Sequence, residues 1–187
     1  MNKKIRIAVL LILLLALLGG AYLLYSRLSL PEQAVRPELP TQADDSARFP
    51  NFSAEDQEGN PVYLSDFIDR PTVVLFWTSW CSFCKLGMDA MAEVYELTGD
   101  EVQFLAVNLS TMGSGRDELT IGRTFMEEAG FPFISIYDIY GEAERAYGVT
   151  AVPLMLFIEA DGTLVHQQLG FLAADALVQY VALLTAN

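Results

Sequence analysis

Apolar and polar positions divide the chain into three stretches with different patterns. The first is an unbroken apolar run, the second is polar and rich in proline, and the third alternates apolar runs with polar segments. A long uncharged run is typical of a membrane helix, and a proline-containing polar stretch is typical of a tether. We therefore expect a membrane anchor over residues 1–26, an extracytoplasmic tether over residues 27–48 and a globular domain over residues 49–187.

The expected anchor is an apolar run over residues 7–25, preceded by Lys3, Lys4 and Arg6. Its length suits a helix that crosses about 30 Å of hydrocarbon. The run continues past Gly19 and Gly20, which favours an uncleaved anchor over a cleaved signal peptide. Basic residues ahead of an apolar span keep the N-terminus in the cytoplasm, so we expect the rest of the chain outside it.

Within the globular part, the apolar pattern predicts an alternation of strands and helices. Apolar and β-branched runs predict strands over residues 72–77, 102–109, 133–137, 154–158 and 164–169, after a short hairpin around residues 58–61. Helical spacing predicts helices over residues 82–98, 117–129, 142–147 and 174–184. Strand–helix alternation implies parallel pairing, whereas the turn at Asp161-Gly162 demands an antiparallel pair. The expected fold is α/β, with a mixed central sheet covered by helices.

The net charge of the chain limits the classes of molecule that it is expected to bind. The formal net charge is −13, and without the three basic residues ahead of the apolar run it is −16. This excess of acid argues against binding to nucleic acid and against close contact with anionic lipid. Apolar residues make up 52% of the chain, which is enough for a full hydrophobic core.

The candidate chemistry is a pair of cysteines, Cys81 and Cys84, which are the only two in the sequence. Cys81 lies at the predicted strand-to-helix turn and Cys84 lies one helical turn further on, so both sulfurs face the same side of the first helical turn. A helix N-terminus favours an anion and lowers the pKa of a thiol. A zinc site needs four ligands, and the sequence adds only one histidine, His166. A structural disulfide over three positions closes too small a loop to stabilise the fold much, so a redox pair is the preferred interpretation.

Several further segments extend this pattern. They are the residues around the pair (76–84), a Gly-Val-Thr-Ala-Val-Pro segment (148–153), a strand with an Asp-Gly turn (157–162), the later Gly170 and an opening segment (59–67). Together they resemble the thioredoxin superfamily, and more narrowly the membrane-anchored extracytoplasmic thiol-disulfide oxidoreductases of the TlpA/ResA type. The resemblance covers the chain from residue 49 to its end.

The resemblance implies a thioredoxin-like three-layer fold and an enzyme that needs no cofactor and no metal. It implies that Cys81 is the exposed nucleophile and Cys84 the buried resolving thiol. Pro153 matches a cis-proline that faces the cysteines, which would expose the backbone of Val152 to an extended substrate segment. Trp80 is expected to flank the reactive sulfur and to contribute to substrate binding.

The resemblance also implies a function: reduction of disulfides in exported proteins, of the cytochrome c maturation type, with electrons from a membrane thiol donor. The location would be a bacterial cell membrane, with one span and the domain on the extracytoplasmic side. Two other interpretations stay open. One is a copper-binding chaperone with Cys81, Cys84 and His166 as ligands, and the other is a thiol oxidase or peroxidase.

Three departures from the family pattern matter. The pair encloses Ser82 and Phe83 in place of a proline-containing dipeptide, so the reduction potential of family members cannot be assigned to this chain. Leu75 and Gly87 stand where relatives place an acid near the resolving sulfur. We therefore expect no carboxylate within roughly 5 Å of the Cys84 sulfur, which is about the reach of a direct proton transfer or of one bridging water.

Overall fold

The computed structural model describes residue 5 and residues 12–20, 48–113 and 118–186. The chain divides into two units, residues 1–38 and 39–187. In the first unit the described residues 12–20 are helical. No helix within the described ranges is long and apolar enough to cross a membrane. Most of the predicted anchor and tether lies outside the described residues.

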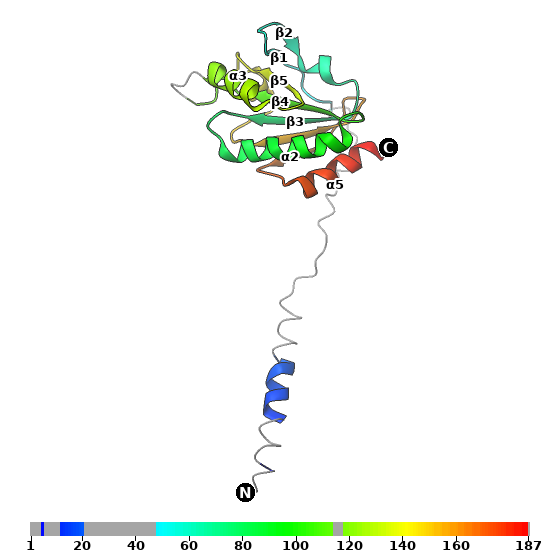
Figure 1. Cartoon of the computed structure of the whole chain (residues 1–187). Helices are drawn as coiled ribbons and strands as arrows, with labels where there is room; N and C mark the ends of the chain where they lie inside the picture. Colours follow the sequence, from blue (N-terminus) through cyan, green and yellow to red (C-terminus); the bar gives the residue numbers. More distant parts are fainter. Residues whose placement is uncertain (1–4, 6–11, 21–47, 114–117, 187) are drawn as a thin grey trace. The chain divides into compact units, whose positions relative to one another are not determined.

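The second unit is built on one seven-stranded sheet with the order β2-β1-β5-β4-β3-β6-β7 (Figure 1). Its strands are β1 (Ser53–Glu55), β2 (Pro61–Tyr63), β3 (Thr72–Trp77), β4 (Gln103–Asn108), β5 (Ile134–Tyr137), β6 (Leu154–Ile158) and β7 (Leu164–Leu169). The strands β3, β4 and β5 are parallel, whereas β6 pairs antiparallel with both β3 and β7, and β1 pairs antiparallel with β2 and β5. The predicted mixed sheet is confirmed.

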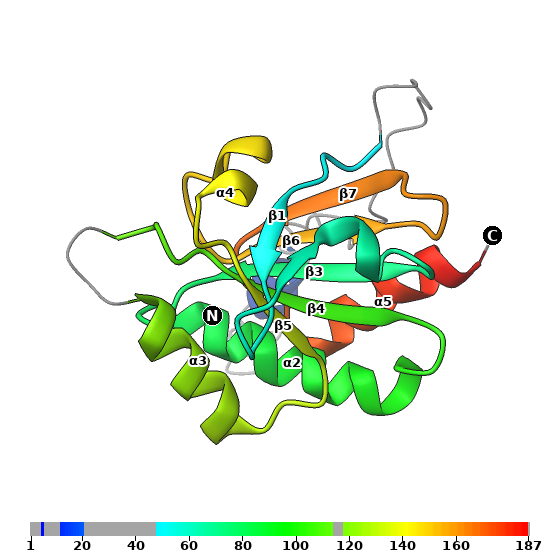
Figure 2. The same cartoon turned by 90° about the horizontal axis from the view of Figure 1, so that it is seen from above.

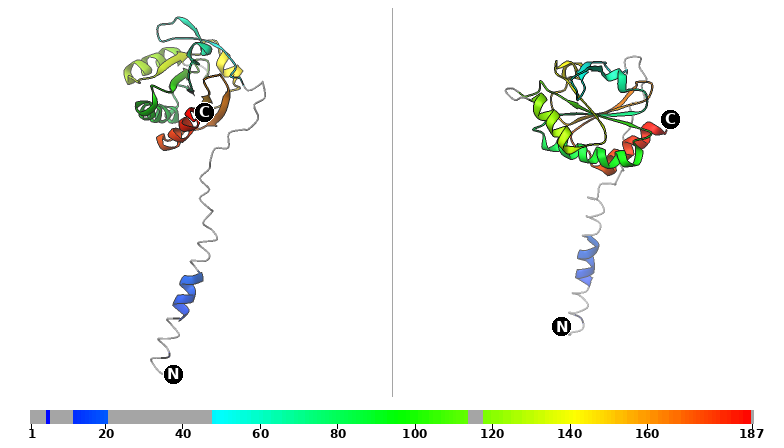
Figure 3. Two further views of the ribbon diagram at one scale, coloured as in Figure 1. Left: turned by 90° about the vertical axis from the view of Figure 1, so that its right-hand side faces the viewer. Right: turned by 45° about the horizontal axis from the view of Figure 1, so that its top comes forward.

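Helices cover both faces of the sheet. They are η1 (Leu64–Phe67), α2 (Ser82–Thr98), α3 (Glu118–Ala129), α4 (Glu142–Ala146) and α5 (Ala174–Thr185). The buried side chains of α2, α3 and α5 join one core cluster, and those of η1 and α4 join the other, so the two groups lie on opposite faces. Figures 2 and 3 show α2, α3 and α5 side by side on one face. This three-layer arrangement is the thioredoxin-like fold that the sequence predicts.

The central strand β3 explains why the two layers of helices hold together. All six residues of β3 are buried, and its side chains alternate between the two clusters. Leu75 packs toward α2, and Val74 and Phe76 pack toward the opposite face. A strand buried on both faces reads as a continuous apolar run, which is why its bounds are predicted correctly from the sequence.

The carboxyl ends of the three parallel strands meet at one edge of the sheet. The Trp77 carbonyl accepts from the Leu109 N–H at 2.9 Å, and the Asn108 carbonyl accepts from the Asp138 N–H at 2.8 Å. The turn that leads from β3 into α2 starts at this edge, because β3 ends at Trp77 and α2 begins at Ser82. Ligand sites in open α/β sheets lie outside the carboxyl ends of the strands.

Candidate active site

The two cysteines form a disulfide at the start of α2. Cys81 and Cys84 are joined with an S–S distance of 2.19 Å and a Cα–Cα distance of 5.3 Å. The Cys81 backbone is extended and serves as the N-cap of α2, whereas Cys84 is within its first turn. The strand-to-helix placement predicted from the sequence is confirmed.

A backbone N–H group contacts the Cys81 sulfur. The Cys84 N–H lies 3.1 Å from the Cys81 Sγ, in the position of a helix-capping hydrogen bond. The N–H groups of the first helical turn and the helix dipole both favour negative charge at this point. A thiolate on Cys81 would therefore be stabilised once the disulfide is reduced.

The burial of the two sulfurs differs less than predicted. Cys84 is fully buried, as predicted, and belongs to the core cluster between α2 and the sheet. The prediction that Cys81 is partly exposed is wrong, because only 7% of this residue is exposed in the disulfide form. The Val152 backbone lies close to the Cys81 sulfur and accounts for part of this cover.

The segment before β6 closes the other side of the sulfur. The Val152–Pro153 peptide bond is cis, as predicted. The Val152 carbonyl oxygen lies 3.8 Å from the Cys81 Sγ. The Pro153 carbonyl accepts a hydrogen bond from the Gly170 N–H at 2.8 Å, which ties the segment to the end of β7. Val152 thus lies beside the Cys81 sulfur, and Pro153 follows it in the chain. The role of both residues in binding substrate remains a prediction.

Aromatic side chains are exposed around the nearly buried sulfur. Trp80 is 45% exposed and Phe83 is 64% exposed, and these two residues flank Cys81 and Ser82 in the chain. A Cβ on Gly113 would lie 3.1 Å from the Trp80 Nε1, so the loop after β4 supports the indole ring. Trp77 is fully buried instead, with its ring centroid 5.4 Å from that of Phe125.

Leu75 and Gly87, the two positions at which the resemblance suggested an acid, pack against each other. A Cβ on Gly87 would lie 3.7 Å from the Leu75 Cδ2, so Leu75 fills the space beside this turn of α2. Leu75, Cys84 and Met88 belong to the same buried cluster. The residues that share the buried cluster with Cys84, such as Leu75 and Met88, are apolar. The absence of a carboxylate beside the Cys84 sulfur stays a prediction.

A buried carboxylate near the motif was missed from the sequence. Glu118, in the first turn of α3, is 1% exposed. It accepts hydrogen bonds from the Ser79 N–H, from the Ser79 hydroxyl at 2.6 Å and from the Asn108 amide at 2.8 Å. Ser79 and Glu118 are 39 positions apart, so neither spacing nor hydrophobic pattern signals this contact. A polar residue at the end of an apolar strand, Asn108, is the one visible sign.

Other candidate residues lie away from the disulfide or engage other partners. The Lys85 ammonium lies 4.7 Å from the centre of the Phe125 ring. His166 stacks on Tyr180 with ring centroids 4.7 Å apart. Burial lowers the pKa of His166, and a contact with Gln168 partly offsets this. Within the described ranges, no three His, Cys, Asp or Glu side chains cluster as metal ligands, so Cys81, Cys84 and His166 do not form the copper site of the alternative interpretation.

For the peroxidase interpretation, Arg123 is the described basic residue to consider, and it engages partners other than the cysteines. Arg123 pairs with Glu55 at 2.7 Å and lies over the Tyr137 ring, with its Cζ 5.0 Å from the ring centre. The loop over residues 114–117 lies outside the described residues.

Comparison with known proteins agrees with this geometry. The AhpC/TSA family model matches residues 46–167. The thiol-disulfide oxidoreductase ResA of Bacillus thuringiensis subsp. konkukian is 26% identical over 184 residues, which are 98% of this chain and 99% of ResA.

Two solved structures share the fold with a TM-score of 0.59. A putative thiol:disulfide interchange protein DsbE from Chlorobium tepidum is 29% identical over 73% of this chain and 94% of its own. The exposed lipoprotein thioredoxin Etrx1 from Streptococcus pneumoniae is 26% identical over 70% and 96%.

The family match covers well over half of the chain and includes both cysteines. It confirms the resemblance drawn from the residues around the cysteine pair. The chain therefore belongs to the AhpC/TSA family and is a thioredoxin-like thiol-disulfide oxidoreductase similar to ResA.

Proposed function

We propose that this protein reduces disulfides in exported proteins through the Cys81/Cys84 dithiol-disulfide couple. The observation that carries the proposal is the Cys81 sulfur at the N-cap of α2, with the Cys84 N–H 3.1 Å away. A nucleophilic thiol needs a stabilised thiolate and an adjacent partner that resolves the mixed disulfide. Both are found within one helical turn.

The reaction proceeds in two exchanges. The Cys81 thiolate attacks one sulfur of a substrate disulfide, and the other substrate sulfur leaves as a thiolate. The Cys84 thiolate then attacks the Cys81 sulfur, which releases the second substrate thiolate and leaves the Cys81–Cys84 disulfide. Two electrons pass to the substrate. A membrane thiol donor returns two electrons to the protein by the reverse exchange.

The substrate would bind as an extended segment along Val152. The Val152 carbonyl oxygen, 3.8 Å from the Cys81 sulfur, is close enough that a segment paired with this backbone brings its own disulfide to Cys81. Trp80 and Phe83 offer exposed aromatic surface beside it. Pro153 donates no backbone hydrogen bond, so the pairing depends on Val152.

The proposed location is the extracytoplasmic side of a bacterial membrane. Residues 1–26 would anchor the chain, residues 27–48 would serve as the tether, and residues 49–187 would form the redox domain. The charge-free run over residues 7–25 and its basic flank support this topology. Similarity to an exposed lipoprotein thioredoxin agrees with it. Among exported substrates, the haem-binding cysteine pair of apocytochrome c is the candidate that the family resemblance suggests.

Trapping in cells tests the substrate. A Cys84→Ser variant cannot resolve the mixed disulfide, so substrates should stay attached to Cys81 and be identified after non-reducing electrophoresis. The double variant Cys81→Ser/Cys84→Ser is the matched control. Exported proteins attached to Cys84→Ser alone would support the proposal, and equal recovery with both variants would contradict it.

Two further measurements test direction and topology. The reduction potential, from equilibration with glutathione, should be low for a reductase, and a high value would indicate a thiol oxidase. Protease added to intact protoplasts should remove residues 49–187. Protection of this domain would contradict the extracytoplasmic location.

A further inference from the structure

Glu118 is a buried acid for which the exchange reaction described above has no use. Both of its carboxylate oxygens accept hydrogen bonds, one from the Ser79 N–H and the Asn108 amide and the other from the Ser79 hydroxyl. An ionised carboxylate only accepts hydrogen bonds, and it offers about four acceptor positions. Three of these are occupied by neutral donors, so the network fixes the orientation of the Glu118 carboxyl group.

In the part of the chain that the structure describes, Glu118 forms no salt bridge. The two salt bridges there join Arg70 to Asp69 and Arg123 to Glu55. Lys85, which follows Cys84, lies over the Phe125 ring. Among the described residues, the Glu118 carboxyl group is held by the neutral donors of Ser79 and Asn108.

The carboxylate holds the turn that carries the reactive sulfur. Ser79 precedes Cys81 by two residues, so their Cα atoms are at most about 7 Å apart. Glu118 binds Ser79 through both its N–H and its hydroxyl. The Cys81 N–H in turn donates to the Thr78 carbonyl at 3.2 Å. Movement of Ser79 would thus shift Cys81 relative to Val152.

Close packing of α3 against the strand ends maintains the network. A Cβ on Gly122 would lie 2.8 Å from the Asn108 Nδ2, so only glycine leaves room for the amide that Glu118 binds. The Asn108 Oδ1 accepts from the Ser110 hydroxyl at 2.9 Å, which fixes the direction of this amide. The network therefore joins the cysteine turn, β4 and α3.

We propose that Glu118 is the positioning residue of the cysteine turn, and that its negative charge restrains thiolate formation at Cys81. This inference rests on the proposed function. A nearby like charge disfavours ionisation of a thiol, whereas the N-terminus of α2 and the Cys84 N–H favour it. Among the described residues, other charged groups near this edge include Lys85 on α2, Asp138 after β5 and Glu144 on α4. Asp138 accepts from the N–H groups of Glu142 and Glu144, and Glu144 accepts from the Thr111 hydroxyl at 2.9 Å. The balance of these groups sets how strongly the couple reduces.

The test compares Glu118→Gln with Asp138→Asn. Glutamine keeps the shape, because its oxygen can accept from Ser79 and Asn108 while its amide donates to the Ser79 hydroxyl. Asp138 is an equally buried carboxylate at the same edge, but it holds α4 and not the cysteine turn. Ser79→Ala keeps the charge and removes only the hydroxyl bond. The readouts on the reduced full-length protein are the pKa of Cys81, from alkylation rate against pH, and the reduction potential.

Glu118→Gln should lower the pKa of Cys81 by roughly 0.5 unit, equal to about a threefold larger thiolate fraction below that pKa. Its reduction potential should rise, because the reduced form is stabilised. Asp138→Asn should change neither value, and Ser79→Ala should not lower the pKa. An unchanged or higher pKa in folded Glu118→Gln would overturn the inference, as would an equal shift in Asp138→Asn. Failure of the wild-type disulfide to be reduced and reoxidised reversibly would instead refute the proposed function.

Discussion

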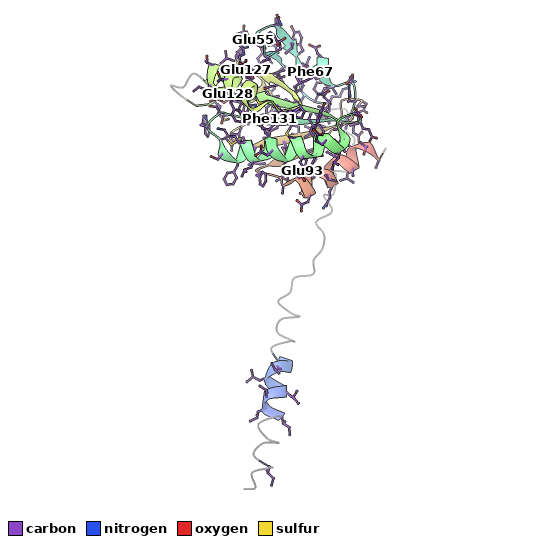
Figure 4. All side chains as sticks on the ribbon, in the orientation of Figure 1. Glu55, Phe67, Glu93, Glu127, Glu128 and Phe131 are labelled. Carbon is purple, nitrogen blue, oxygen red and sulfur yellow. A yellow bond between two sulfur atoms is a disulfide. The ribbon has the colours of Figure 1, made fainter. Side chains whose placement is uncertain are left out.

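The two ends of the parallel strands differ in the features that would mark a site. At the carboxyl ends, the Cys81 sulfur is nearly buried and is approached by backbone groups of Cys84 and Val152. At the amino end of β5, a hollow of about 520 Å³ lies between the turn after β1 and the end of α3. Its lining includes Met126 and Phe131 together with three acidic residues, Asp56, Glu58 and Glu127. Glu127 and Phe131 are labelled in Figure 4.

This hollow and the redox-active disulfide therefore lie at opposite edges of the sheet. Disulfide exchange needs a thiolate and a backbone edge that guides an extended segment, and neither requires an enclosed cavity. The hollow offers space, but its titratable side chains are Asp56, Glu58 and Glu127, all exposed or half-buried. The redox-active groups therefore lie in one turn, the turn from β3 into α2.

The largest expected effect comes from the cysteines themselves. Cys81→Ser should abolish reduction of a model disulfide, because the attacking sulfur is lost. Cys84→Ser should still form a mixed disulfide but should stop turnover, because nothing resolves it. Turnover assays and intact mass measurements distinguish the two. Equal residual turnover in both variants would remove the distinction between the two cysteines.

Much of the structure around the disulfide, at the carboxyl ends of the parallel strands, could be predicted from the sequence. The cysteine pair follows a continuous apolar run, and this pattern alone places it at the turn from β3 into α2. Helix α2 is also correctly bounded, because Gly99 marks its end. Local patterns of this kind carry their own signal.

The network around Glu118 could not be predicted, because its members are distant in sequence. Ser79, Asn108 and Glu118 meet only after β3, β4 and α3 pack together. The low exposure of Cys81 likewise depends on Val152, which is 71 positions away. The hollow at the opposite edge has no sequence signature, since its lining comes from loops and strand ends.

Two helical glycines, Gly122 in α3 and Gly87 in α2, test how closely the helices pack at the disulfide end of the sheet. Gly122→Ala should lower the free energy of unfolding by roughly 1–3 kcal/mol, since the new Cβ would displace the Asn108 amide from Glu118. Gly87→Ala is the control: its Cβ would meet only Leu75 at 3.7 Å, and alanine should add up to about 1 kcal/mol of helix stability. Urea unfolding of the oxidised proteins measures both. A loss of stability in Gly87→Ala as large as in Gly122→Ala would contradict this account of the packing.

A smaller effect, on the pH dependence of stability, is expected from His166, which lies on β7. Its folded pKa lies below the usual 6.5 because burial against Phe157 and Tyr180 disfavours the charged form. Below about pH 6.5 the unfolded chain binds the proton first, so the free energy of unfolding should fall as pH drops until the folded pKa is passed. Unfolding of wild type and His166→Gln at several pH values from about 7.5 to 5 tests this. If both proteins show the same pH dependence, His166 is not its source.

The smallest expected effect is at the hollow. Glu127→Gln changes one charge on its rim, at the edge of the sheet opposite the disulfide. Disulfide reduction should stay within about twofold of wild type, because the residue contacts no part of the cysteine turn that the structure describes and distant surface charges are screened. A larger change in turnover, with stability unaltered, would show that the two ends are coupled.

The most direct test of the central claim is alkylation of the reduced full-length protein with a limiting amount of iodoacetamide, followed by peptide mass analysis. The N-cap position and the Cys84 N–H predict that Cys81 is labelled first. The buried position of Cys84 predicts that it is labelled only after unfolding. Preferential labelling of Cys84 in the folded protein would contradict the assignment of Cys81 as the attacking thiol.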